Sequence, residues 1–118
     1  MTPTPLPTPL TDAEYFALTR SLLDAVEAQT DAWLQADVID IDAQRTGGLL
    51  ELSFPNGSKI IVNTQPPLQE VWLAARSGGF HYKHIAGKWT DTKDGREFLA
   101  ALSACASEQA GRALVFSA

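Results

Sequence analysis

Apolar residues recur every three or four positions near the start of the chain and predict a long amphipathic helix. Thr11 and Glu14 form a capping-box pattern, so the helix is expected over residues 12–34. Its inward stripe follows helical spacing and comprises Tyr15, Leu18, Leu22, Val26, Gln29 and Trp33. The opposite side carries Arg20, Asp24, Glu27 and Asp31. The helix therefore presents an apolar face to a core and an acidic face to solvent.

After residue 37 apolar and polar residues alternate with a period of two, which predicts strands. In the segment V-I-D-I-D, residues 38–42, Ile39 and Ile41 fall on one side and the aspartates on the other. Further strands are expected at L-L-E-L-S-F, S-K-I-I-V-N, E-V-W-L-A-A, F-H-Y-K-H-I and Trp89-Thr90, although the six residues E-V-W-L-A-A could also be helical. Turn signals separate them at residues 47–48, 55–57, 65–67, 77–79 and 87. Short strands joined by tight turns indicate an antiparallel meander.

A second helix is expected near the C-terminus. Asp94 and Glu97 repeat the cap pattern, Phe98, Leu102, Cys105 and Gln109 form the buried stripe, and Gly111 ends the helix. The following A-L-V-F is expected to pack back on the body. The element order predicts an α+β fold, a two-layer sandwich in which the N- and C-terminal helices pack on one face of an antiparallel sheet of five to six strands. The other sheet face is then open to solvent.

The proline-rich segment T-P-T-P-L-P-T-P predicts a different organisation for the first ten residues. Alternating prolines block helix formation and remove amide donors. We therefore expect residues 1–10 to form a flexible tail and residues 11–118 to form a single domain.

Composition excludes several classes of function. The chain has 118 residues, of which 45% are hydrophobic and 19% charged, which suits one folded domain. A net charge of −5 argues against nucleic-acid binding, and no apolar run is long enough for a membrane span. A single cysteine excludes an internal disulfide and fits a reducing compartment. With no signal-peptide pattern at the start, we expect a cytoplasmic protein.

The negative charge is concentrated in the first half of the chain. Residues 1–58 contain nine acidic and two basic residues, whereas residues 59–118 contain five acidic and seven basic residues. If the first strand lies at the sheet edge beside the first helix, one negative strip would comprise Asp24, Glu27, Asp31, Asp37, Asp40 and Asp42. Carboxylate oxygens suit iron, calcium, magnesium and manganese, so an open, shallow and weak metal site is expected. From the pattern alone a solvated acidic surface is the alternative interpretation.

Signatures of enzymes are scarce in the sequence. No phosphate loop, dinucleotide fingerprint, nucleophile elbow or H-E-x-x-H motif occurs. His81 and His84 lie three apart on an expected strand and should point to opposite faces. Cys105 falls on the buried stripe of the second helix and is interpreted as a structural thiol.

Trp72 is the candidate contact residue of the open sheet face. If Val71 and Leu73 point to the helices, Trp72 points to solvent, where a tryptophan is a plausible binding hot spot. Asn63 and Gln65 lie two positions apart on an expected strand, so they point to one face and could lie near Trp72. The alternative is that Trp72 is covered by a loop or is itself part of the core.

Residues 47–82 carry a longer pattern, which resembles the frataxin family in its bacterial form. The segment reads G-G-L-L-E-L-S-F-P-N-G-S-K-I-I-V-N-T-Q-P-P-L-Q-E-V-W-L-A-A-R-S-G-G-F-H-Y. Its characteristic positions are Asn63, Gln65, Pro67, Trp72, Leu73 and the Gly-Gly-aromatic-His run of residues 78–81. The resemblance extends from about Thr11 to Phe116 and agrees with the predicted order of helix, meander and helix.

This resemblance implies an iron-binding protein of iron–sulfur cluster assembly. It implies that ferrous or ferric iron binds weakly and reversibly to Glu27, Asp31, Asp40 and Asp42, with Asp24 and Asp37 added here from geometry and charge. It also implies that the acidic strip, through Glu27 and Asp31, docks on a cysteine desulfurase and regulates it or supplies iron. The open face with Asn63, Gln65, Pro67 and Trp72 would contact the scaffold protein of the same complex.

The sequence also departs from the family pattern on the first helix. Ala28, Ala32 and Leu34 occupy places where bacterial relatives often carry acids, which should lower the charge density that holds metal. The alternative function is a ferroxidase that oxidises and stores ferrous iron, but no Glu-x-x-His pair is present for a di-iron site. We expect a non-enzymatic protein that is monomeric without metal.

Overall fold

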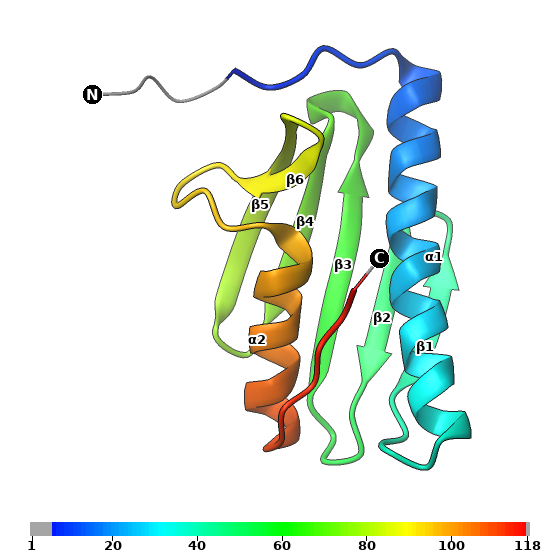
Figure 1. Cartoon of the computed structure of the whole chain (residues 1–118). Coiled ribbons are helices and arrows are strands. Elements are labelled where there is room, and N and C mark those ends of the chain that lie inside the picture. Colours follow the sequence, from blue (N-terminus) through cyan, green and yellow to red (C-terminus); the bar gives the residue numbers. More distant parts are fainter. Residues whose placement is uncertain (1–5, 118) are drawn as a thin grey trace.

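The computed structural model describes residues 6–117, which form two helices packed against one face of a six-stranded antiparallel sheet (Figure 1). The predicted α+β sandwich is thereby confirmed. The strands follow one another in spatial order as a meander: β1 (Asp42–Thr46), β2 (Leu49–Ser53), β3 (Lys59–Gln65), β4 (Glu70–Ala75), β5 (Gly78–Ile85) and β6 (Lys88–Asp91). The helices are α1 (Asp12–Gln35) and α2 (Phe98–Ala110), and a 3₁₀ turn spans Pro66–Leu68. No helix in this part of the chain is long and apolar enough to cross a membrane.

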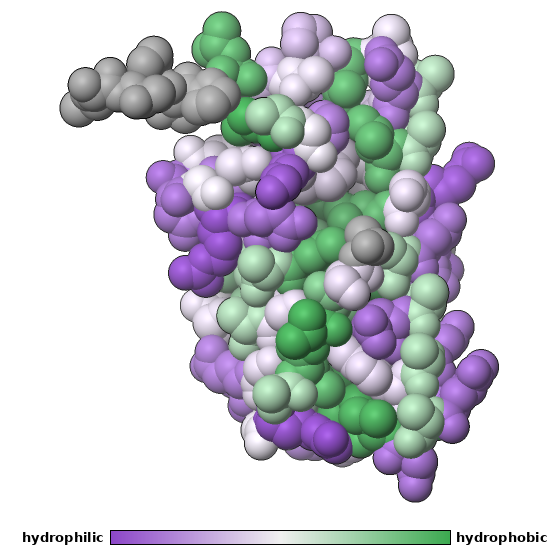
Figure 2. All heavy atoms as spheres, in the orientation of Figure 1, coloured by the Kyte–Doolittle hydropathy of each residue, from purple (hydrophilic) through white to green (hydrophobic). Residues whose placement is uncertain are grey.

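The core lies between the sheet and the two helices. It is built from the apolar sets that the period-two pattern predicts, including Leu50, Leu52 and Phe54 of β2 and its turn, all of which are buried. After α2 the chain returns between the helices, where Leu114 and Phe116 are buried (Figure 1). Figure 2 shows the apolar surface in this region between the helices, with hydrophilic residues along the outer edge of α1. The expected return of A-L-V-F onto the body is confirmed, although Val115 is exposed.

The first strand begins later than the sequence predicts. Residues 38–41 are not part of the sheet, and β1 starts at Asp42, opposite Ser53 of β2. The pairing does not extend further because β2 ends at Ser53. The next residue, Phe54, donates its amide to the carbonyl of Ser58 across the following turn. Ile41 is nevertheless buried and Ile39 packs against the core, so the predicted sides of this segment are correct.

The predicted cap of the second helix at Asp94 is wrong by three residues, because Glu97 is the N-cap. The Asp94 carboxylate accepts the amide of Arg96 instead, and Asp91 accepts the amides of Lys93 and Asp94. This turn brings Glu97 beside Thr90, and Glu97 caps α2 by accepting the amide of Ala100. The predicted buried stripe and the stop at Gly111, which has a left-handed conformation, are confirmed.

Two smaller differences concern the ends of elements. The turn predicted at residues 77–79 falls one residue earlier, because Gly78 and Gly79 already belong to β5. In the expected tail, residues 1–5 lie outside the described part of the chain, whereas Thr8 donates its amide to the carbonyl of His84 at 2.7 Å. Leu10 packs partly buried against the core. The described end of this segment is therefore held against the domain.

Candidate functional site

Helix α1 places its acidic side at the edge of the molecule. The Thr11–Glu14 capping box is present, with both reciprocal hydrogen bonds formed, and fixes where the helix begins. Its buried stripe lies against the sheet, so Asp24 and Asp31 are exposed and Glu27 is half-buried. Strand β1 is an edge strand, which is the condition on which the expected acidic strip depended. We call the six carboxylates along this edge the acidic face; they are Asp24, Glu27 and Asp31 of α1, Asp37 and Asp40 of the connection, and Asp42 of β1.

An arginine that the sequence analysis did not consider neutralises part of the acidic face. The guanidinium of Arg45, on the helix-facing side of β1, lies 2.5 Å from Asp24 and 2.8 Å from Glu27. The hydrogen bonds that Arg45 donates to Asp24 and Glu27 raise the pKa of Arg45, despite a smaller opposing effect of burial. Two of the six predicted ligands are therefore engaged in an internal ion pair, which only the packing of α1 on β1 creates.

The other four carboxylates remain available. Asp31, Asp37, Asp40 and Asp42 are exposed and make no ion pair with a lysine or arginine of residues 6–117. Asp42 accepts a hydrogen bond from Gln44 at 3.1 Å. These carboxylates follow the end of α1, the connection and the start of β1, at one end of the domain (Figure 1). Within the described residues no three His, Cys, Asp or Glu side chains form a group that could hold a metal ion, so this is an open array.

The open face of the sheet brings the predicted contact residues together. Val71 and Leu73 are buried towards the helices, and Trp72 is half-buried on the other face, as the alternation predicts. Asn63 of β3 lies directly opposite Trp72, and Gln65 lies opposite Glu70 on the same side. Pro67 follows on the 3₁₀ turn and is exposed.

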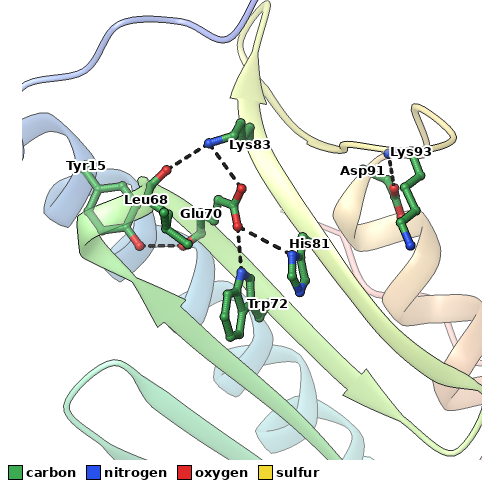
Figure 3. Close-up of polar contacts among 8 residues, drawn as sticks. All are labelled: Tyr15, Leu68, Glu70, Trp72, His81, Lys83, Asp91 and Lys93. Atoms are coloured by element: carbon green, nitrogen blue, oxygen red, sulfur yellow. Dashed lines mark hydrogen bonds and ion pairs between the residues drawn. The ribbon is translucent and has the colours of Figure 1, made fainter.

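Glu70 organises this part of the open face, and the sequence analysis missed it. Its carboxylate accepts the Trp72 indole at 2.8 Å and pairs with Lys83 at 3.2 Å, while His81 Nδ1 lies 3.7 Å away (Figure 3). Burial raises the pKa of Glu70, but the hydrogen bonds from Trp72 and Lys83 and the Lys83 charge outweigh this effect. The net result is a pKa below the ordinary value of 4.5. The sequence contained a signal for this cluster, because residues 70 and 72 of one expected strand and residues 81 and 83 of the next alternate onto the same face.

The remaining candidates occupy the positions that their patterns predict. His81 lies opposite Trp72 on the open face, whereas His84 lies opposite Trp89, and three residues of separation place them on opposite faces. Cys105 is buried and its sulfur lies 3.5 Å from the hydroxyl of Ser77. Its interpretation as a structural thiol agrees with this burial.

Comparison with known proteins identifies the family. The model of the frataxin-like domain matches residues 8–112 of the chain. The fold, two helices on a six-stranded antiparallel sheet, agrees with this match. The chain belongs to the frataxin family.

Individual relatives are similar over nearly the whole chain. The "Iron-sulfur cluster assembly protein CyaY" of Polaromonas sp. (strain JS666) is 53% identical over 109 residues, which cover 92% of this chain and 94% of the relative. The frataxin of Psychromonas ingrahamii, whose structure is solved, is 36% identical, with a TM-score of 0.82 and coverage of 92% of this chain and 100% of that chain. Trimeric yeast frataxin, described as complexed with ferrous iron, shares the fold at 24% identity, with a TM-score of 0.65 and coverage of 92% and 94%.

Proposed function

We propose that this protein binds iron weakly and reversibly and acts in iron–sulfur cluster assembly. In this role it docks on the cysteine desulfurase and scaffold complex in the cytoplasm and regulates it or supplies iron to it. The names of close relatives support the assembly role, and the ferrous complex of a yeast family member supports iron as the cargo. The proposal assigns no catalytic residue.

The exposed carboxylates of the acidic face are the observation that carries this proposal. Asp31, Asp37, Asp40 and Asp42 make no ion pair with basic residues among residues 6–117, so their charge is available to a cation or a basic protein surface. Hard oxygen ligands suit iron, and an open array without an enclosing shell gives weak, exchangeable binding. The same charge steers association with a basic partner and weakens with salt.

The open face supplies a second, less charged contact surface in this proposal. Asn63, Gln65, Pro67 and Trp72 lie on one side of the sheet and at its end, where they offer two amides, a rigid turn and a large ring. Tryptophan dominates the energy of many protein interfaces because it buries much apolar area with few rotamers. We assign this surface to the scaffold protein and the acidic face to the desulfurase.

Paramagnetic broadening of amide signals tests the site of iron binding. On addition of ferrous iron under anaerobic conditions, signals from residues 24–42 should be lost first. Asp31→Lys and Asp40→Lys should each weaken both iron and desulfurase binding, whereas Glu108→Lys, an exposed charge reversal on α2, should not. Uniform broadening, or equal loss of affinity in all three variants, would refute the assignment. Catalytic oxygen consumption with ferrous iron would instead support the ferroxidase alternative.

A further inference from the structure

The ring of Trp72 is held on two sides by neighbours on the open face. Its indole Nε1 donates to Oε1 of Glu70 at 2.8 Å, which fixes one edge of the ring. The imidazole of His81 is stacked on one face, with ring centroids 4.4 Å apart and an angle of 8° between the planes (Figure 3). These contacts limit the motion of the side chain before any partner arrives, which lowers the entropy lost on binding.

The same two neighbours are electrostatically linked. His81 Nδ1 lies 3.7 Å from the Glu70 oxygen that accepts the indole. The Glu70 side chain is only 11% exposed, whereas that of His81 is 51% exposed and can exchange protons with solvent. Histidine is the side chain that ordinarily changes charge between pH 5 and 8. A proton on His81 would add an ion pair with Glu70 and a cation–π interaction with Trp72.

We propose that Glu70 and His81 are positioning residues for Trp72, and that protonation of His81 fixes the indole ring for docking of a partner on the open face. The docking part of this inference rests on the proposed function. The positioning part concerns the free protein and can be tested without any partner.

The other charged groups around this site do not cancel the effect. Lys83 of β5 pairs with Oε2 of Glu70 and bonds the carbonyl of Leu68 at 3.0 Å, which leaves Oε1 to the two rings. Lys88 of β6 is opposite Ile85, at the far end of the strand from His81. From β3, the residues opposite Trp72 and Glu70 are the neutral Asn63 and Gln65. After β6, Thr92 donates its amide to the His81 carbonyl and Lys93 follows it, but the one ion-pair partner of His81 among the described residues is Glu70.

The free protein provides the first measurement. The indole N–H signal of Trp72, assigned by its loss in Trp72→Phe, should shift and its order parameter should rise between pH 8 and pH 5.5. His81→Asn should abolish this response. Glu70→Gln, which keeps an acceptor for the indole but removes the charge, should reduce it. His84→Asn, at the only other histidine of the chain, should leave it unchanged. A response that persists in His81→Asn, or is absent from the wild type, would overturn the inference.

Docking provides the second measurement. The affinity for the purified scaffold complex in metal-free buffer is compared at pH 5.5 and pH 7.5 for the wild type and His81→Asn, so that titration of the partner cancels. The wild type should gain roughly two- to fivefold more affinity on acidification than the variant, the range of an exposed cation–π contact. Equal pH dependence in both would overturn the docking role of His81. No binding of the wild type at either pH would instead refute the proposed function, because the free-protein response is measured separately.

Discussion

Replacing Arg45 by glutamine should strengthen binding of ferrous iron to the acidic face. The guanidinium of Arg45 lies 2.5 Å from Asp24 and 2.8 Å from Glu27, so in the native protein two carboxylates are already neutralised in part. Glutamine retains a polar side chain at this position of β1 but removes the positive charge. Both carboxylates then become available to a metal ion, and the local repulsion of cations disappears.

The magnitude follows from Coulomb's law. At a separation of about 6 Å in water, a unit charge repels a divalent ion by roughly 1.4 kcal/mol, and salt of about 0.1 M reduces this to roughly half. We therefore expect the affinity to rise about three- to tenfold. The fold should lose about 0.5–1 kcal/mol, because the Asp24 side chain is 61% exposed and exposed ion pairs contribute little, whereas the pair with Glu27, which is 32% exposed, contributes more.

Anaerobic calorimetric titration with ferrous iron measures the affinity, and thermal unfolding measures the stability. Arg76→Gln is the matched control: it changes the net charge equally, and Arg76 is exposed in the turn between β4 and β5, away from the acidic face. If Arg45→Gln gains no more affinity than Arg76→Gln, the carboxylates around Arg45 do not contribute to iron binding.

Three further predictions concern the fold. Gly48→Ala should destabilise by about 1–3 kcal/mol in denaturant unfolding, because a Cβ at this position would clash with Oγ1 of Thr64; an unchanged midpoint would contradict the close approach. Tyr82→Phe should be neutral or stabilising by up to about 1 kcal/mol, because its buried hydroxyl has no hydrogen-bond partner among the described residues, and a large loss of stability would reveal a missed partner. Because the folded-state pKa of Glu70 lies below 4.5, its contribution to stability is complete above that pH and is lost as the pH falls further. Unfolding of Glu70→Gln as a function of pH should therefore show a flatter acid limb than the wild type, and identical limbs would contradict the shift.

Most elements of the fold were predictable because local chemistry specifies them. The capping box at Thr11 sets the start of α1, and Gly111 sets the end of α2 through its left-handed conformation. The errors fall where a distant segment decides the boundary. Asp42 begins β1 because Ser53 is the last residue of β2 that can pair with it.

The candidate site likewise has features that the sequence predicts and features that only the tertiary structure decides. Helical spacing places Asp24, Glu27 and Asp31 on the outer side of α1, and strand alternation places Trp72 on the open face, since side-chain direction follows directly from backbone geometry. Only the tertiary structure decides which groups meet across elements. Arg45 reaches Asp24 from 21 positions away, and His81 stacks on Trp72 because β4 and β5 pair in one register. Periodicity determines the face on which a residue lies, whereas strand register and helix packing determine its neighbours and therefore its charge environment.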